Sequence, residues 1–507
     1  MRALISVSDK RGILDFSEIL LSLGFEIIST GGTSEYLTNN KIPVVDISEI
    51  TSFPEILEGR VKTLHPKIHG GILAKRNKKL HLKEINELGI VGIDIVVNNL
   101  YPFQETISDK DVLFQEALEN IDIGGPAMTR AAAKNFEDVL IIVDPEDYDN
   151  VGKILISGEV DYKLRCYLAS KAFRHTAFYD TLVANFLSNT DTNLKFPNYI
   201  TSGWELEKIP RYGENPHQKS AVYKSPNETG GIVNAEKLHG IEMSYLNYFD
   251  ADAAWIASNL FDEQCVSIIK HGNPCGLSVN YDQTEAYKRA VKGDPISAFG
   301  GIVGFNKEVT ESTANEMRDH FIDVIVAPSY EKNALEIFKK RKRTRILQVS
   351  QNKLSSLMFR SVSGGILVQE FDPNNDSSEN WDVVTKKKPN KKIFDDLEFS
   401  WKISSLIKSN AIVVAKDRTI LGMGAGQPNR LNSVKLATSS LEKNYYQDSV
   451  LASDAFFPFP DNLISAREKG IKSFIQPGGS IKDQEIINVA NELGLIMIFT
   501  HTRHFLH

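Results

Sequence analysis

Short apolar runs alternate with helical patterns along the first 190 residues of the chain. The apolar runs cover residues 3–7, 25–28, 44–47, 93–97 and 139–143. They are continuous rather than alternating, as expected of strands that are buried on both faces of a sheet. Between the first two runs, apolar residues recur at helical spacing: Ile13, Phe16, Ile19 and Leu20. Gly24 follows at the place of a helix cap. Strands that alternate with helices predict a parallel sheet in a Rossmann-type α/β domain.

A second, larger α/β domain is expected after a polar segment at residues 188–193. This segment is poor in helix formers, so we place the boundary there, with domains at 1–190 and 195–507. Apolar runs at 266–269 and 411–415 predict further buried strands in the second domain. No internal repeat stands out along the chain.

Composition excludes several classes of protein. A chain of 507 residues is too long for one core and indicates roughly two to four domains. The net charge of -7 argues against extensive nucleic-acid binding, and the basic runs at 339–345 and 386–392 are typical of solvated faces. Three cysteines, Cys166, Cys265 and Cys275, are too few for a disulfide framework. The N-terminal apolar run is too short for a signal peptide, and no run approaches the ~18 residues of a membrane helix. We therefore expect a cytoplasmic protein that binds neither nucleic acid nor membrane.

The segment 270–276 has the sequence Lys-His-Gly-Asn-Pro-Cys-Gly and follows a predicted strand. A cation and an imidazole therefore stand where a strand ends and a turn begins. Ligands of α/β proteins bind beyond the carboxyl ends of strands, so Lys270 and His271 can serve two different atoms of one substrate. A surface lysine beside a histidine that caps a turn is the alternative.

The same segment resembles half of a zinc site. Pro274 and Cys275 match the start of the Pro-Cys-x-x-Cys element of zinc deaminases, but Ser278 stands where the second cysteine would be. His65 and His69 are separated by Pro66 and do not replace it. We expect no catalytic metal.

Two loops of the first domain have the chemistry of phosphate sites. Residues 6–10 close the first predicted strand and residues 29–33 close the second, and each loop opens a helix. Free backbone N–H groups, hydroxyls and glycines at a helix start accommodate a phosphate. Ordinary helix capping is the alternative for one such loop. Two loops with a lysine beside one favour a phosphorylated ligand. The candidate contacts are Ser6, Ser8, Lys10, Thr30, Gly31, Gly32 and Thr33.

Three further segments of the first domain, at 60–71, 98–103 and 121–134, concentrate polar groups. The first is a basic, glycine-rich stretch that suits an anion, although a solvated loop is the alternative. The second offers an amide and a phenol beyond the fourth predicted strand. The third contributes a carboxylate and two glycines before a helix that carries basic residues. The candidate residues are Arg60, Lys62, Thr63, Asn99, Tyr101, Asp122, Gly124 and Lys134.

Polar and aromatic segments are denser in the second domain. Residues 211–218 pack a cation, a phenol, an amide and an imidazole into one turn-rich octet. Residues 422–430 form a glycine-rich loop ending in Arg430, a candidate anion ligand. Residues 453–460 form an aromatic and proline-rich wall that suits a flat ring, with simple packing as the alternative. The tail at 502–507 is rich in aromatic and imidazole groups, so we expect it to dock.

Taken together, these motifs resemble the family of bifunctional purine-biosynthesis enzymes that join AICAR formyltransferase to IMP cyclohydrolase, almost from end to end. The resemblance implies a methylglyoxal-synthase-like first domain and a second domain of two cytidine-deaminase-like subdomains without zinc. It implies that AICAR takes a formyl group from 10-formyltetrahydrofolate and that the product, FAICAR, closes to IMP. No tightly bound cofactor is implied.

Residue roles follow from the resemblance. For formyl transfer, His271 would take the proton of the AICAR amine and Lys270 would stabilise or protonate the leaving side. Substrate contacts would be Arg211, Tyr212, Phe299, Gly300, Asp323, Asn410, Arg430 and Phe456, with Pro458 on the folate side. For ring closure, the matching cluster is Lys62, Thr63, Asn99, Tyr101, Asp122 and Lys134, and the two loops at 6–10 and 30–33 match the phosphate contacts.

The resemblance also implies a homodimer whose formyltransferase sites lie between subunits. A non-catalytic purine-nucleotide sensor of the same fold is the main alternative, and a fused zinc deaminase is the second. The complete sets of reactive residues disfavour the sensor, and the missing ligands disfavour the deaminase.

Overall fold

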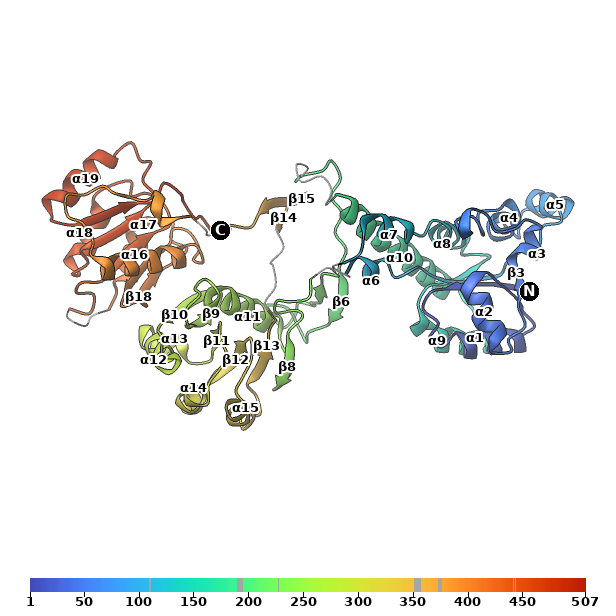
Figure 1. The fold of residues 1–507 in the computed structure, drawn as a ribbon, viewed down its shortest axis with the longest axis horizontal. Coiled ribbons are helices and arrows are strands. Elements are labelled where there is room, and N and C mark those ends of the chain that lie inside the picture. Colours follow the sequence, from blue (N-terminus) through green and yellow to red (C-terminus); the bar gives the residue numbers. More distant parts are fainter. Residues whose placement is uncertain are drawn as a thin grey trace. The chain divides into compact units, whose positions relative to one another are not determined.

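The computed structural model describes residues 1–108, 111–188, 195–226, 228–350, 357–372, 376–440, 442 and 444–507 (Figure 1). The chain forms two compact units, which divide at Trp204 and Glu205, with a short segment from Ser225 belonging to the first. We call them unit 1 and unit 2. The polar segment at 188–193, taken from the sequence as the boundary, lies outside the described residues from position 189 onward.

Unit 1 is built on a five-stranded parallel sheet of order β3-β2-β1-β4-β5. Its strands are β1 (Arg2–Val7), β2 (Glu26–Ser29), β3 (Val45–Asp46), β4 (Ile95–Asn99) and β5 (Leu140–Ile142). All five predicted strands are present, and the predicted parallel α/β fold is confirmed. The helices are α1 (Ile13–Ser22), α2 (Gly31–Asn39), α3 (Ile47–Thr51), α4 (Pro66–Leu73), α5 (Lys79–Glu87), α6 (Phe103–Ser108), α7 (Phe114–Glu119), α8 (Gly124–Lys134), α9 (Tyr148–Ser157) and α10 (Tyr162–Ser188).

Helices cover both faces of this sheet. Ala3 and Ile5 pack into a core with α1 and α9, whereas Leu4 packs into a second core with α4, α8 and α10. Because successive strand residues point to opposite faces, burial of both faces requires the continuous apolar runs seen in the sequence. Gly24 has φ +80° immediately after α1, so the predicted glycine cap is confirmed.

Unit 2 is built on a twelve-stranded mixed sheet of order β16-β21-β20-β19-β17-β18-β10-β9-β11-β12-β13-β8. Its strands are β8 (Glu236–His239), β9 (Cys265–Lys270), β10 (Asn273–Val279), β11 (Gly301–Phe305), β12 (Ile322–Ala327), β13 (Arg345–Gln348), β16 (Asp382–Val383), β17 (Ile412–Lys416), β18 (Thr419–Gly424), β19 (Val450–Ser453), β20 (Ser473–Gln476) and β21 (Ile496–Phe499). Two separate hairpins are β6 (Glu205–Lys208) with β7 (Val222–Lys224), and β14 (Leu357–Val362) with β15 (Gly365–Glu370).

The large sheet contains the same topology twice. In the first half, the hairpin β9–β10 is followed by β11, antiparallel to β9, and then by the parallel strands β12 and β13. In the second half, the hairpin β17–β18 is followed by β19, antiparallel to β17, and then by the parallel strands β20 and β21. Each half begins with a helix before its hairpin. The helices of unit 2 are α11 (Tyr245–Ser258), α12 (Gln283–Gly293), α13 (Pro295–Ala298), α14 (Glu311–Glu316), α15 (Lys332–Lys339), α16 (Lys391–Ser404), α17 (Arg430–Ala437), α18 (Asp461–Glu468) and α19 (Asp483–Glu492).

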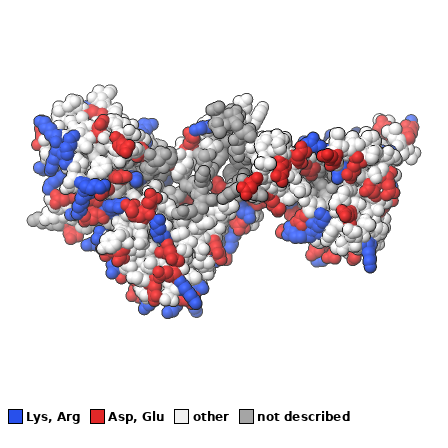
Figure 2. All heavy atoms as spheres, viewed as in Figure 1, with Lys and Arg blue, Asp and Glu red and all other residues white. Residues whose placement is uncertain are grey.

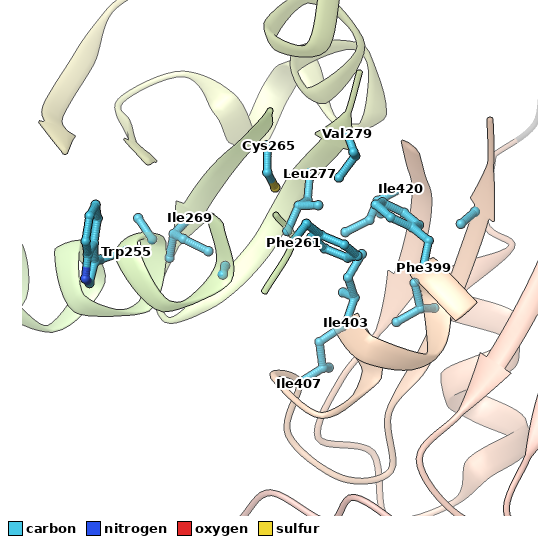
Figure 3. Close-up of a cluster of buried hydrophobic side chains, with 14 of the residues drawn as sticks. Trp255, Phe261, Cys265, Ile269, Leu277, Val279, Phe399, Ile403, Ile407 and Ile420 are labelled. Carbon is cyan, nitrogen blue, oxygen red and sulfur yellow. The ribbon is translucent and has the colours of Figure 1, made fainter. Parts of the chain in front are cut away.

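One apolar core joins the two halves of unit 2 (Figure 3). Leu277 of β10 meets residues of α16 and β18, including Phe399 and Ile420. Phe261 stacks on Phe399 with ring centroids 5.3 Å apart. Burial of this apolar surface stabilises the halves as one unit. Among the helices of the described residues, none is long and apolar enough to cross a bilayer.

Candidate functional site

Strand register brings the predicted residues of the first half of unit 2 to one edge of the large sheet. Lys270 ends β9, and Ile269 pairs with Ile302, so the start of β11 lies beside the end of β9. Strand β12 runs parallel to β11, so Asp323 at its start lies at the same edge. The backbone of Phe299 and Gly300 leads into β11 at this edge.

The second half contributes to the same edge because β10 and β18 are antiparallel. Ile412 pairs with both Gly424 and Ser453, so the start of β17 and the end of β19 lie at the edge where β10 begins. Strands β9 and β17 are separated by β10 and β18, so three strand spacings, about 14 Å along the sheet, lie between their ends. The edge is therefore wide enough to hold two small molecules side by side.

Lys270 and His271 occupy a tight hairpin. Lys270 pairs with Asn273, so His271 and Gly272 are the two central residues of the turn, with φ +53° and +71°. Positive φ at both positions is typical of the type I′ turn that suits a two-residue hairpin. His271 is exposed at the tip. The ammonium of Lys270 donates a hydrogen bond to the carbonyl of Phe299.

The residue whose carbonyl accepts this hydrogen bond, Phe299, is aromatic. Phe299 is 66% exposed, and its ring lies 5.2 Å from that of Phe321. The amide of Gly300 donates to the carbonyl of Phe321 over 2.8 Å, which fixes the loop. A cation, an imidazole and an exposed ring in one place suit a substrate with a flat heterocycle. Asp323 lies one strand further, 3.8 Å from the guanidinium of Arg345.

A second cluster surrounds Arg430, the first residue of α17. Its guanidinium is 7% exposed and forms an ion pair with Asp454, which is fully buried. It also donates to Ser453 Oγ over 2.9 Å and to Asn410 Oδ1 over 2.6 Å. Asp454 was not among the predicted site residues, although it belongs to the segment 453–460 that the sequence singled out. Phe456 is 40% exposed close by in the chain.

The C-terminal tail docks beside this cluster, as expected from the sequence. His504 is 3% exposed, and its amide donates to the carbonyl of Asp454 over 3.1 Å. Its ring contacts Asp372 and Asp376 at 2.6 and 3.3 Å. Burial lowers the pKa of His504, but the hydrogen bonds to Asp376 and Asp372 outweigh this and raise it above its ordinary value.

Arg211 and Tyr212 lie apart from both clusters, in the connection between β6 and β7. The guanidinium of Arg211 stacks 4.9 Å above the ring of Tyr212. Arg211 is exposed, and among the described residues neither member of this pair forms a hydrogen bond or ring contact with Lys270 or Arg430. The fold of one chain therefore does not bring this predicted pair to the other residues.

In unit 1, Lys62 lies against the second predicted phosphate loop. Its ammonium is 3.1 Å from Glu55 Oε2, and Thr30 donates to Glu55 Oε1 over 3.0 Å. A methyl group on Gly31, where φ is +53°, would lie 3.1 Å from the ammonium. Glu55 therefore links Lys62 to the loop, a role that nothing in the sequence pattern indicated.

Two residues of unit 1 that were predicted to bind a ligand form hydrogen bonds with the protein backbone instead. Asn99 Oδ1 accepts from the amides of Ser8 and Asp9 at 2.7 and 2.9 Å. Thr33 Oγ1 accepts from the amide of Val7 and donates to its carbonyl. Both side chains hold the loop at 6–10 in shape. Lys10 points its ammonium over the ring of Tyr36, 5.8 Å from the ring centre.

Asp122, Thr63 and Gly124 meet at the start of α8. Asp122 Oδ1 accepts from the amide of Gly125 over 2.8 Å, and the Asp122 amide donates to the hydroxyl of Tyr179 over 2.7 Å. A methyl group on Gly124 would lie 2.7 Å from Thr63 Oγ1, so only glycine permits this approach. Burial raises the pKa of Asp122, against backbone hydrogen bonds that lower it. This carboxyl group is suited to hold or give a proton.

We expect Asp122→Asn to unfold at a higher temperature than the native protein at pH 7. The pKa of Asp122 is raised in the fold above its ordinary 3.8, so the unfolded chain ionises first and stability falls as pH rises through the folded pKa. Asparagine keeps the oxygen that accepts from Gly125 without the buried charge. Thermal unfolding between pH 4 and 8 checks this, because the advantage should shrink towards pH 4. An advantage that is constant over this range would contradict it.

Lys134 lies away from this cluster within one chain. Lys134 ends α8, about 15 Å along the helix axis from Gly124. It lines a cavity of about 600 Å³ together with Arg130, Phe136, Cys166 and other residues of α8 and α10. Arg60 forms an exposed ion pair with Glu119 at 2.7 Å. The sequence places two glycines before this helix, but the helix begins at Gly124, so the glycines belong to its first turn.

The cysteine and basic residues noted in the sequence have structural contacts in the part of the chain that the structure describes. No group of three or more His, Cys, Asp or Glu is placed to hold a metal ion there. Burial raises the pKa of Cys275 to about 12, so its thiol stays protonated. Basic and acidic side chains are interspersed over the face shown in Figure 2. Within the basic run at 339–345, Arg341 and Arg345 donate to backbone carbonyls.

A polar cavity of about 850 Å³ lies at the opposite edge of the large sheet, before β19 and β20. Arg467, Lys469 and Lys472 line it, and none of the predicted site residues do.

The fold and these clusters define a two-unit α/β protein with reactive groups beyond strand ends, the arrangement of enzymes that convert small anionic, ring-bearing substrates. Comparison with known proteins makes this specific. Residues 132–440 match the family described as "AICARFT/IMPCHase bienzyme", and residues 12–127 match an "MGS-like domain".

Curated relatives match over the whole chain. A "Bifunctional purine biosynthesis protein PurH" of Bacillus cereus (strain AH187) is 50% identical over 511 residues, which cover 100% of this chain and 99% of the relative. The protein of that name in Bacillus anthracis (strain CDC 684 / NRRL 3495) is 49% identical over the same coverage. A solved structure, "Crystal structure of ForH", is 41% identical and covers 38% of this chain and 98% of its own, with a TM-score of 0.35. The chain therefore belongs to the AICARFT/IMPCHase bienzyme family, and the predicted family resemblance is confirmed.

Proposed function

We propose that unit 2 transfers the formyl group of 10-formyltetrahydrofolate to the 5-amino group of AICAR, and that unit 1 closes the resulting FAICAR to IMP. Membership of the bienzyme family supports the pair of reactions. The match of residues 12–127 to an MGS-like domain supports giving ring closure to unit 1. The observation that carries the assignment of unit 2 is the strand register that brings Lys270 and Arg430 to one sheet edge.

Formyl transfer makes one C–N bond and breaks another. The amine of AICAR attacks the formyl carbon and loses a proton, while N10 of the folate leaves and gains one. A weakly nucleophilic aromatic amine needs a base, and His271 at the exposed tip of the hairpin is accessible for this task. Lys270 lies next to it as the cation that stabilises or protonates the leaving nitrogen. The exposed ring of Phe299 offers a surface for a substrate heterocycle.

Arg430 and Asn410 are proposed to bind AICAR, with Asp323, Gly300, Phe456, Arg211 and Tyr212 as further contacts and Pro458 on the folate side. Because Arg211 and Tyr212 lie apart from the edge in one chain, a homodimer with sites between subunits would account for their participation. The folate serves as a cosubstrate, and no tightly bound cofactor is proposed.

Ring closure requires attack of the carboxamide nitrogen on the formyl carbon, stabilisation of an oxyanion and loss of water. Lys62, Thr63 and Asp122 are proposed to act at the reacting atoms, with Asn99, Tyr101 and Lys134 as further members of the cluster. The loops at 6–10 and 30–33 are proposed to bind the phosphate. The carboxyl of Asp122, whose pKa burial raises, lies beside the amides of α8 and is proposed to give a proton to the departing water.

Incubation with AICAR and 10-formyltetrahydrofolate tests the function, with tetrahydrofolate and IMP followed separately. We expect both to form in the native protein. Lys62→Ala should slow ring closure about 100-fold or more and leave formyl transfer unchanged, so that FAICAR accumulates. Lys78→Ala, a lysine of unit 1 just before α5, is the matched control. An unchanged IMP yield in Lys62→Ala would count against this site. Absence of tetrahydrofolate in the native reaction would favour a non-catalytic nucleotide sensor.

A further inference from the structure

We propose that Asp250 is a positioning residue for formyl transfer, because it holds the turn that carries His271; the inference rests on the function proposed for His271. Asp250 Oδ1 accepts a hydrogen bond from the amide of Gly272 over 2.7 Å. This contact reaches from α11 to the tip of the β9–β10 hairpin, 22 residues along the chain. No sequence motif pointed to Asp250.

The turn requires an external support. His271 has φ +53°, a conformation in which the Cβ of an L residue is crowded, so the backbone there is strained. Asn273 Nδ2 donates to the His271 carbonyl over 2.9 Å, which secures one side of the turn. The Asp250 carboxylate secures the other side through the Gly272 amide. The imidazole between these two hydrogen bonds therefore projects from a fixed backbone.

Helix α11 is a rigid base for this contact. It packs into the core of unit 2 through Ala251, Ala254 and Trp255. Phe249 lies under the turn as well, since a methyl group on Gly272 would be 2.8 Å from its ring. Asp250 thus fixes the reactive hairpin relative to a helix that is anchored in the core.

The internal repeat supplies independent support, because the chain uses the same device a second time. In the second half, Asp396 of α16 accepts from the amides of Asp417 and Arg418 at 3.0 and 2.7 Å. These two residues form the β17–β18 turn, with φ +53° and +52°.

The lysine before each turn is repeated too. Lys416 ends β17 and donates to the carbonyl of Gln447 over 2.9 Å, as Lys270 ends β9 and donates to that of Phe299. The two hairpins therefore share their supports, and only the first carries an imidazole. In both hairpins the carboxylate holds the turn, and in the first hairpin this turn also carries the imidazole of His271.

Three variants of the full-length protein test the proposal. Asp250→Ala removes the acceptor, Asp250→Asn keeps an oxygen at the same place without the charge, and Asp396→Ala removes the matching support from the other turn. We expect Asp250→Ala to lower kcat for formyl transfer about 10- to 100-fold with little change in KM for AICAR, as a misplaced catalytic group does. Asp250→Asn should stay within about 3-fold of native kcat. Asp396→Ala should cost stability without a comparable loss of kcat.

Chemical denaturation, followed by the unit 2 transition, serves as the control for folding, and hydrogen exchange at the Gly272 amide reports the contact directly. Exchange should be faster in Asp250→Ala and native-like in Asp250→Asn. Native kcat in Asp250→Ala would overturn the proposal. If kcat fell equally in Asp250→Asn and Asp250→Ala, the charge of Asp250 and not its hydrogen bond would be what matters. If kcat fell as much in Asp396→Ala, general destabilisation would explain the loss. If the native protein transferred no formyl group, the proposed function would fail, whereas the exchange rates would still decide whether Asp250 holds the turn.

Discussion

Replacing His271 with alanine is expected to abolish formyl transfer to AICAR and to leave ring closure of supplied FAICAR at the native rate. A positioned general base contributes about 100- to 10,000-fold to rate, and the described edge offers no second imidazole next to Lys270. His271 is exposed at the tip of a turn, so its removal deletes no packing in the core. The loss should therefore appear in kcat and not in stability. Release of tetrahydrofolate and formation of IMP, measured separately, check both halves of this expectation.

His239→Gln is the matched control, because His239 is a half-buried histidine of the same unit on the outermost strand β8. Its ring contacts the carbonyl of Arg341, and glutamine can reproduce that hydrogen bond. This variant should transfer formyl groups at nearly the native rate. Loss of ring closure together with formyl transfer in His271→Ala would refute the division of the two reactions between the units.

The part of the fold that the sequence predicts best is the part with the strictest physical pattern. Strands β1 and β4 are buried on both faces, so they need unbroken apolar runs, and the sequence locates them within two residues. The residues beyond strand ends were also predictable. Lys270 and Asn99 stand out because polar groups cluster where a buried run stops.

Long-range pairing could not be predicted. The contact between β10 and β18 joins Ser278 to Thr419 across 141 positions, and local periodicity carries no information about it. The repeat in unit 2 is hidden from the sequence for the same reason. The two halves share their topology, but the turn residues are His271-Gly272 in the first half and Asp417-Arg418 in the second. The sequence pattern therefore predicts that reactive groups lie at the ends of strands, but it does not predict which of these strand ends lie together in the sheet.

Supporting residues were missed for a related reason. Asp250 and Glu55 stand among largely apolar neighbours in the sequence and acquire their roles only through contacts with Gly272 and Lys62. A single carboxylate is a common surface residue, so no spacing rule distinguishes one that holds a catalytic group. Lys134 illustrates the converse, since its place in a basic helix suggested a shared cluster, whereas the helix puts it about 15 Å from Gly124.

Arg430→Met is expected to destabilise unit 2 by about 3–5 kcal/mol and to stop formyl transfer. The Arg430 guanidinium and the Asp454 carboxylate are 7% and 0% exposed, so removing the cation leaves a charge in the interior without its partner. Asn410 Oδ1 and Ser453 Oγ lose a donor as well. Chemical denaturation of the full-length protein, followed by the unit 2 transition, measures the stability term. Lys472→Met, which breaks the exposed ion pair with Asp448, is the matched control and should cost about 1 kcal/mol or less.

The double variant Arg430→Met/Asp454→Leu separates stability from binding. Replacing both members of a buried ion pair with apolar side chains of similar size is often close to neutral, so most of the lost stability should return. Formyl transfer should not return, because the guanidinium proposed to bind AICAR is still absent. A double variant that is stable and active would show that Arg430 serves only the fold. A double variant as unstable as Arg430→Met would show that stability is lost because Asn410 and Ser453 lack their hydrogen-bond donor, rather than because the charge of Asp454 is unpaired.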